Sequence, residues 1–331
     1  MAVLFLWLKG AYFRVVIHDV INHRIRQRFY YTYEIMLLGC VLQVWGCILV
    51  KTTRGDHTMT FDMFLNFDGD CRDALNFYAG VFGLATPTHI MTYEQAPGGG
   101  FGEGNTGRIL YSTLPIFGRN VMFSDCPVGS GYVKGTNAAL HLNSDDKSEM
   151  QRIFDTLADG GTVEMPLEKT FFSEFFGSVT DRFGVSWNLD LCEQKALNVY
   201  LAFDGDCRAA LDFYAKAFGL EFPDVMTFEQ DPDGGVAKED EGRIMHAELS
   251  VFGGRLMASD CPSGSDFVKG TNMAISLGTS DKDKIERVFA ALADGGKIAM
   301  PLGKTFFSEL YGMVTDSFGI TWQLSLPPSG N

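Results

Sequence analysis

The sequence has few histidines and no arrangement of cysteines that would form a disulfide framework. Six histidines and seven cysteines are spread over 331 residues, and no two cysteines have C-x-x-C spacing. An odd number of cysteines in a chain this long is not typical of a disulfide-bonded secreted scaffold, and it favours a reducing compartment. We therefore expect a cytoplasmic protein.

The sequence also lacks any run of basic residues interleaved with aromatic ones. Residues 1–59 hold seven of the 27 Lys/Arg and three of the 41 Asp/Glu, which leaves 20 basic and 38 acidic residues, a net charge of −18, for residues 60–331. A body this acidic repels phosphate backbones, so nucleic acid is excluded as an expected partner. With 46% hydrophobic residues, the chain is long enough for two or three globular domains.

Residues 1–59 form an apolar and basic N-terminal segment for which three interpretations are open. The stretch Ile35–Val50 is apolar except for Gln43 and has basic residues on both sides, which is typical of a membrane anchor, although roughly 20 residues are needed to cross a bilayer as a helix. A signal peptide fits poorly, because the apolar stretch comes late and no small-x-small cleavage site precedes Lys51. The third interpretation is an upstream extension of the gene model, with Met59 as the working start.

The rest of the chain is an internal duplication. Residues 67–78, FDGDCRDALNFY, return at residues 203–214 as FDGDCRAALDFY. Further motifs then follow in the same order at an offset of 135, among them VKGTN at 133–137 and 268–272, and KTFFSE at 169–174 and 304–309. A period this long indicates two whole domains rather than a solenoid. We place the domains at residues 60–193 and 194–331.

The pattern within each copy predicts two similar modules. Phe61–Phe67 alternates like a half-buried strand, and residues 71–82 have apolar side chains at helical spacing, with Asp70 as N-cap and Gly83 as the stop. Short strands follow, and then a second strand and a helix at residues 146–158 begin the same order again. Each copy is therefore predicted to hold two βαβββ modules, an α+β architecture.

These motifs, with VTDRFGVSW at 179–187 and VTDSFGITW at 314–322, resemble the PhnB-like branch of the vicinal oxygen chelate superfamily. That superfamily also contains glyoxalases, fosfomycin- and bleomycin-resistance proteins and extradiol dioxygenases, and the resemblance covers residues 61–326. It implies that paired modules form a curved, half-closed sheet with a ligand cavity on its concave face. It also implies a divalent metal held by two histidines and a glutamate in the superfamily's enzymes. We do not expect methyltransferase activity, because no Gly-rich loop follows a strand to hold a nucleotide-like cofactor.

The residues at the metal-ligand positions are not the usual ligands. The aligned positions hold Met63 and Val199 on the first strands, Asn137 and Asn272 opening the second modules, and Asn188 and Gln323 on the last strands. Only three histidines lie in the repeats, and none recurs at its counterpart: His89, His141 and His246. A duplicated histidine site is therefore excluded, and we expect no metal cofactor.

One asymmetric metal or acid/base site remains as an alternative. His246 and Glu248 are two residues apart on a predicted strand, so they point to the same face and could hold one divalent ion. The competing interpretation pairs them with each other or with solvent. In the first copy Tyr111 and Thr113 take their places.

Other duplicated residues are candidates for the cavity or for ligand binding. Tyr111 and an aromatic set are expected to line the cavity beside the six aligned positions: Phe172, Trp187, Phe307 and Trp322. Four lysines are candidates for binding an anionic ligand: Lys134, Lys169, Lys269 and Lys304. Asp125 and Asp260 are expected to cap turns, and the neighbouring cysteines are not expected to be catalytic.

We expect a small-molecule-binding protein without the usual metal site. The alternatives are a metal-dependent lyase or dioxygenase of glyoxalase type using His246 and Glu248, and a structural or interaction protein that binds no ligand. The two copies are expected to pack as a pseudo-twofold dimer within one monomeric chain. The sequence leaves open whether modules swap between the copies.

Overall fold

The computed structural model describes residues 2–8, 11–17, 59–97, 104–231 and 237–326, and the chain divides into two units, Met1–Thr53 and Arg54–Asn331. In the first unit, β1 (Ala2–Leu8) and β2 (Ala11–Ile17) form an antiparallel sheet. The possible anchor at residues 35–50 lies outside the described residues. Over the part of the chain that is described, no helix has the length and apolar character needed to span a bilayer.

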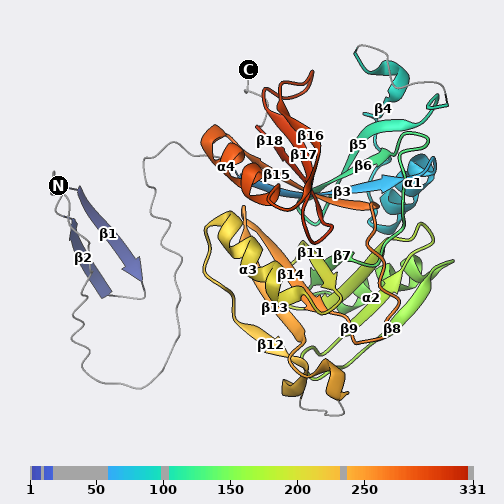
Figure 1. Ribbon diagram of the computed structural model, residues 1–331. Coiled ribbons are helices and arrows are strands. Elements are labelled where there is room, and N and C mark those ends of the chain that lie inside the picture. Colours follow the sequence, from blue (N-terminus) through green and yellow to red (C-terminus); the bar gives the residue numbers. More distant parts are fainter. Residues whose placement is uncertain (1, 9–10, 18–58, 98–103, 232–236, 327–331) are drawn as a thin grey trace. The chain divides into compact units, whose positions relative to one another are not determined.

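The second unit contains four modules, each a strand and a helix followed by three strands, as the sequence predicts (Figure 1). The first repeat contains β3 (Met59–Phe67), α1 (Cys71–Val81), β4 (Met91–Thr92), β5 (Ile109–Ile116), β6 (Arg119–Asp125), β7 (Ala138–Ser144), α2 (Lys147–Ala158), β8 (Thr162–Glu168), β9 (Phe176–Thr180) and β10 (Ser186–Leu191). The second contains β11 (Ala196–Phe203), α3 (Cys207–Phe218), β12 (Val225–Thr227), β13 (Ile244–Val251), β14 (Gly254–Asp260), β15 (Met273–Thr279), α4 (Lys282–Leu292), β16 (Lys297–Gly303), β17 (Tyr311–Thr315) and β18 (Thr321–Ser325). Short 3₁₀ turns follow β4 and β12: η1 (Tyr93–Gln95), η2 (Phe228–Gln230) and η3 (Lys238–Asp240). The α+β class is confirmed.

The modules are exchanged between the repeats. The first sheet has the order β12-β13-β14-β11-β7-β10-β9-β8, and the second has the order β16-β17-β18-β15-β3-β6-β5-β4. Each sheet thus joins the second module of one repeat to the first module of the other. The repeat boundary at residues 193 and 194 falls between β10 and β11, which belong to the same sheet. The question of swapping that the sequence left open is answered by this order.

Each sheet has one apolar side and one mixed side because its strands alternate. On β11, Leu197 and Val199 are fully buried in the core that the helices cover, whereas Asn198 and Tyr200 point to the opposite side. The strands on either side of β11 follow the same pattern. We call the side of the first sheet that faces away from this core the first face, and the same side of the second sheet the second face.

The two VKGTN motifs clasp each other across a pseudo-twofold relation. Asn137 Oδ1 accepts from the Gly270 amide at 2.8 Å, and Asn272 Oδ1 accepts from the Gly135 amide at 3.0 Å. The two glycine backbones approach so closely that a Cβ on Gly135 would lie 2.2 Å from the Gly270 Cα. Glycine at this crossing is therefore a packing requirement, and the clasp fixes one repeat against the other.

Buried aspartates hold each repeat together. Asp181 accepts hydrogen bonds from the Tyr78 hydroxyl at 2.6 Å and from Trp187 Nε1 at 2.9 Å, and so ties α1 to the β9–β10 turn. Asp316 makes the same two bonds in the second repeat. Asp125 accepts from the amides of Gly69, Cys71 and Ile109 and so caps α1, while the predicted N-cap Asp70 makes no side-chain cap bond.

Candidate functional site

The first face gathers polar and aromatic side chains from both repeats. Strand register places Asn188 of β10 and Asn198 of β11 on either side of His141 on β7. On one side of these three central strands lie β14, which carries Arg255, and then β13, which carries His246 and Glu248. The polar and aromatic residues of this face include His141, Asn143, Phe176, Asn188, Asp190, Asn198, Tyr200, His246, Glu248 and Arg255.

His141 is a buried, neutral histidine at the centre of this face. Its side chain is 4% exposed, and burial, helped by nearby Arg255, lowers the pKa of its imidazole to about 3. Asn198 Nδ2 donates to Asn143 Oδ1 at 3.0 Å, so the Asn143 amide nitrogen, 3.2 Å from His141 Nε2, donates to that ring atom. His141 Nε2 is therefore the acceptor, and the ring proton lies on Nδ1.

His246 lies one aromatic ring away from His141. The Tyr200 ring stands between them, with centroids 6.0 Å from each imidazole, and its hydroxyl lies 3.5 Å from His246 Nδ1. Burial lowers the pKa of His246, opposed by the nearby Glu248 carboxylate. Glu248 in turn pairs with Arg255, which raises the pKa of that guanidinium. His246 and Glu248 thus share a face, as predicted, but Glu248 is paired with an arginine rather than with the histidine.

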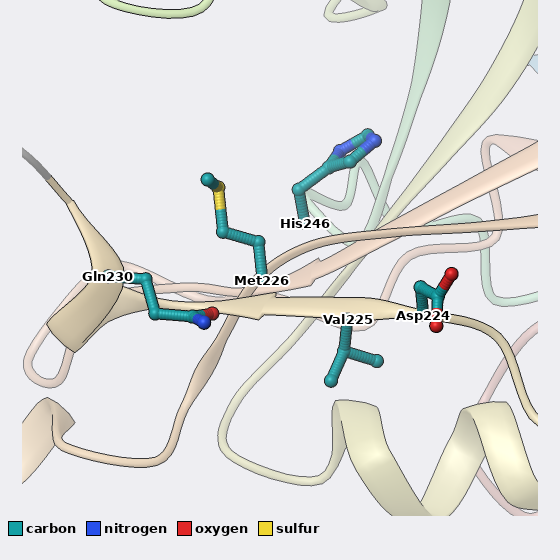
Figure 2. A pocket seen from close by; sticks show the side chains of 5 residues that line it. All are labelled: Asp224, Val225, Met226, Gln230 and His246. Atoms are coloured by element: carbon teal, nitrogen blue, oxygen red, sulfur yellow. The ribbon is translucent and has the colours of Figure 1, made fainter.

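Two shallow pockets lie at corresponding places on the two sheets. The pocket on the first sheet has a volume of about 430 Å³ and is lined by Asp224, Val225, Met226, Gln230 and His246. Figure 2 shows His246 and Met226 projecting to the same side of the sheet, while Val225 points the other way, toward a helix. The counterpart of about 400 Å³ is lined by His89, Ile90, Met91, Gln95, Tyr111 and Thr113. Both pockets lie toward the β12 and β4 ends of their sheets, so they reach only the margin of each face.

The second face has little of this chemistry. Ser276 stands at the position of His141, Gly278 at that of Asn143, and Ser325 at that of Asp190. Tyr111 and Thr113 replace His246 and Glu248 on β5. Asp62, whose pKa is raised by burial, accepts a hydrogen bond from the Asn120 amide and is the charged residue on the central strands here. The duplication has kept the fold and changed the surface.

Several residues expected in the cavity are in the core. Met63, Val199, Trp187 and Trp322 are fully buried on the helix side of their sheets, and each Trp indole is bonded to an aspartate. For Met63 and Val199 the physical reason is the period of two in a strand, because an alignment error of one residue moves a side chain to the opposite face. The neighbours Asp62 and Asn198, not Met63 and Val199, occupy the two faces.

The remaining expected residues are divided among different places. Asn188 and Gln323 point to the first and second faces, and Tyr111 lines the second pocket. Phe172 and Phe307 lie on exposed loops. Asn137 and Asn272 belong to the clasp between repeats and so line neither face, which corrects the expectation, because their side-chain oxygens are bonded to backbone amides there.

The four candidate lysines do not gather on either face. The Lys134 and Lys269 side chains lie against Gly184 and Gly319. Lys169 and Lys304 are exposed and pair with Glu174 at 2.6 Å and Glu309 at 2.9 Å. Their role in binding an anion stays a prediction.

Sequence reasoning missed His141, Asp190, Tyr200 and Arg255 as site residues. His141 was set aside because it has no counterpart in the second repeat, where Ser276 stands. The exchange of modules brings this single histidine of the first repeat onto the same sheet as the single His246 of the second. Counting histidines per repeat could not find this pair, whereas counting them per exchanged sheet would have.

These residues do not fit the metal held by two histidines and a glutamate in the superfamily's enzymes. His141 Nε2 accepts from Asn143, and Glu248 is paired with Arg255. Nowhere in the described ranges do three His, Cys, Asp or Glu side chains cluster closely enough to hold a metal ion.

Comparison with known proteins places the fold in a family. The chain matches the model of the Glyoxalase/Bleomycin resistance protein/Dioxygenase superfamily over residues 196–324, and that of 3-demethylubiquinone-9 3-methyltransferase over residues 59–190. Protein YjdN of Escherichia coli is 31% identical over 147 residues, which are 41% of this chain and 98% of YjdN. An uncharacterized protein of Mycobacterium tuberculosis is 31% identical over 143 residues, 40% of this chain and 75% of that protein.

A solved structure shows the same fold across both repeats. Glyoxalase I from Zea mays superimposes with a TM-score of 0.53 at 18% identity, covering 81% of this chain and 92% of that protein. The chain belongs to the glyoxalase/bleomycin resistance protein/dioxygenase superfamily, in its PhnB-like branch, with two copies of the family domain in tandem.

Proposed function

We propose that this chain binds one small molecule on the first face, without a bound metal ion. The observation that supports this most is the composition of that face. His141 and Asp190 come from the first repeat, while Tyr200, His246 and Arg255 come from the second, and the exchanged modules place them on one sheet. Polar groups that converge among aromatic side chains are a usual mark of a small-molecule site.

The electrostatics of the first face favour a ligand of low charge. The His141 imidazole is neutral, and the charges of Glu248 and Arg255 offset each other in their pair. Asp190 lies with its carboxylate 3.8 Å from His141 Nε2, and burial raises its pKa. The face therefore offers hydrogen bonds rather than a strong net field, which suits a neutral or weakly anionic molecule.

Metal-dependent lyase or dioxygenase chemistry is the second candidate. His246 and Glu248 share a face with His141 and Asp190, and all four are residue types that bind divalent ions. For a metal to bind, Glu248 would have to leave Arg255. A protein that only holds a structural partner and binds no small molecule is the third.

The experiment is elemental analysis of the full chain before and after chelation, with ligand-observed NMR against a panel of small carboxylates, phenols and phosphonates. Two matched variants are His246→Ala and Tyr111→Ala, at corresponding positions of the two sheets. We expect substoichiometric metal and a bound panel member that His246→Ala weakens and Tyr111→Ala does not. Stoichiometric metal lost in His246→Ala would establish the metal-dependent alternative, and no bound compound at all would favour the interaction protein.

We also propose a cytoplasmic location and an unassociated chain. Five cysteines in the described ranges are free thiols, which fits a reducing compartment. The clasp between the VKGTN motifs supports a pseudo-twofold pairing within one polypeptide. Sedimentation of the purified chain at one molecular mass across concentrations would support the monomer, and a concentration-dependent mass would contradict it.

A further inference from the structure

A continuous row of aromatic rings crosses the first face. It begins on the exposed loop before β9 with Phe171 and Phe172 and continues to Phe176, with ring centroids 5.0 Å apart at both steps. It then passes to His141 at 6.5 Å, to Tyr200 at 6.0 Å and to His246 at 6.0 Å. Rings at these spacings make the offset or edge contacts that stabilise aromatic clusters, and flat ligands use the same contacts.

The second face has rings at both ends of the corresponding row, with Phe64 and Tyr111 at the positions of Tyr200 and His246, but no ring in its middle. Phe306, Phe307 and Tyr311 follow each other with the same 5.0 Å spacings. The next position is Ser276, which has no ring, and so the row stops where His141 extends it on the first face. One chain therefore holds both the complete row and its interrupted counterpart.

Unmet hydrogen-bond donors lie on the same face. Among the described residues, the buried side-chain nitrogen and oxygen atoms that lack a partner are His141 Nδ1 and Arg255 Nε. Arg255 Nε always carries a hydrogen, and the His141 proton lies on Nδ1 because Nε2 accepts from Asn143. Both atoms are therefore donors. A buried donor without an acceptor is unfavourable, so a ligand that brings acceptor atoms would supply the hydrogen bonds that the free chain lacks.

We propose that the first face binds a planar aromatic molecule carrying oxygen acceptors, such as an aromatic carboxylate or phenolate, and that it binds one per chain. This rests on the function proposed above and names the ligand class. The aromatic ring of the ligand lies along the row of protein rings, and the oxygens of the ligand accept hydrogen bonds from His141 Nδ1 and Arg255 Nε. Both N–H groups are covered by neighbouring side chains, so binding displaces one of them.

The test is calorimetric titration of the full chain with three small probes. Salicylate has the planar ring and the oxygen acceptors, cyclohexanecarboxylate has the same charge without the planar ring, and benzylammonium has the ring with donors only. We expect salicylate to bind one per chain and cyclohexanecarboxylate about three- to tenfold more weakly, because one aromatic contact is worth that ratio. Benzylammonium is expected not to bind.

Three variants locate the site. His141→Phe keeps a ring and removes the donor, and Tyr200→Leu breaks the row, so each should weaken salicylate about three- to tenfold. Phe64→Leu, at the position of Tyr200 on the second face, is the matched control and should leave salicylate binding unchanged. Circular dichroism and thermal unfolding confirm that each variant is folded, and Tyr200→Leu carries the test if His141→Phe does not fold.

The outcomes separate the ligand class from the proposed function. Equal binding of salicylate and cyclohexanecarboxylate, weakened by His141→Phe, would overturn the aromatic class and leave the binding site in place. Failure of salicylate to bind, while a non-aromatic compound of the NMR panel does, would have the same meaning. Two molecules of salicylate per chain, or equal weakening by Phe64→Leu, would overturn the restriction to the first face.

Discussion

The two faces of this protein have the same fold and different chemistry. Behind each sheet the same Tyr–Asp–Trp arrangement is found, with Asp181 in one repeat and Asp316 in the other. On the two faces the corresponding positions differ: Ser276 stands where the first face has His141, and Tyr111 stands where it has His246. The two repeats therefore share the residues that pack the core and differ in the side chains that lie on the two faces.

The difference also shows what module exchange makes possible. A site built within one repeat would change whenever that repeat changed. Here each face takes half of its residues from each repeat, so single substitutions in different repeats can meet on one sheet. His141 and His246 are such a pair. The second face received neither, and it keeps uncharged groups such as Gln323.

The largest effect that we predict concerns the core behind the two faces, where the two repeats should respond to substitution in the same way. Trp187→Ala and Trp322→Ala should each lower the free energy of unfolding by about 3–5 kcal/mol, because a large cavity opens, with further loss from the unmet aspartate acceptors. Urea unfolding measures this, with the exposed Phe172→Ala as the control. Weaker ligand binding at an unchanged unfolding midpoint would instead place these tryptophans in a cavity.

A smaller effect should be the pH dependence of stability, which His141 on the first face should produce and Ser276 on the second face should not. His141 titrates at about 3 when folded and near its ordinary 6.5 when unfolded, so the unfolded chain binds the extra proton between these values. Stability supplied by neutral His141 is present above pH 6.5 and is lost as the pH falls toward 3, by roughly 5 kcal/mol at most over the whole range. In His141→Gln the thermal unfolding temperature should depend less on pH over this range.

The control for the pH experiment is Ser276→Ala, at the corresponding position on the second face, which should keep the full acid loss. If His141→Gln and wild type fall together between pH 6.5 and 3, then His141 is not the group responsible. Titration of the His141 ring carbon protons by NMR would then show a pKa near the ordinary value. A buried, neutral His141 would then no longer distinguish the first face from the second.

The sequence predicts most of the fold and little of the site, for a physical reason. Repeats, alternation and helix spacing are local patterns, so α1 is predicted at residues 71–82 and observed at Cys71–Val81. Strand pairing between modules is not local. Nothing in either repeat specifies that β11 pairs with β7 rather than β3, so the meeting of His141 with His246 is decided by the exchange.

The site predictions also depended on register. Met63 and Val199 were aligned to within one residue of positions that do point to the faces, and one residue is enough to turn a strand side chain into the core. His246 and Glu248 were placed correctly on one face because their spacing of two is a property of any strand. Their partners Tyr200 and Arg255 come from neighbouring strands and had no local signal.

The smallest effect should come from the lysines, and it decides whether charge outside the two faces contributes to binding. Lys169 and Lys304 are exposed and paired with Glu174 and Glu309, and such pairs contribute about 0–1 kcal/mol. Lys169→Ala and Lys304→Ala should therefore change the unfolding midpoint little and leave salicylate affinity within about twofold at physiological salt. Calorimetry at two salt concentrations measures this. A larger loss of salicylate affinity in Lys169→Ala alone would indicate that this lysine contributes to anion binding at the first face. The two faces would then also differ in the loop before β9.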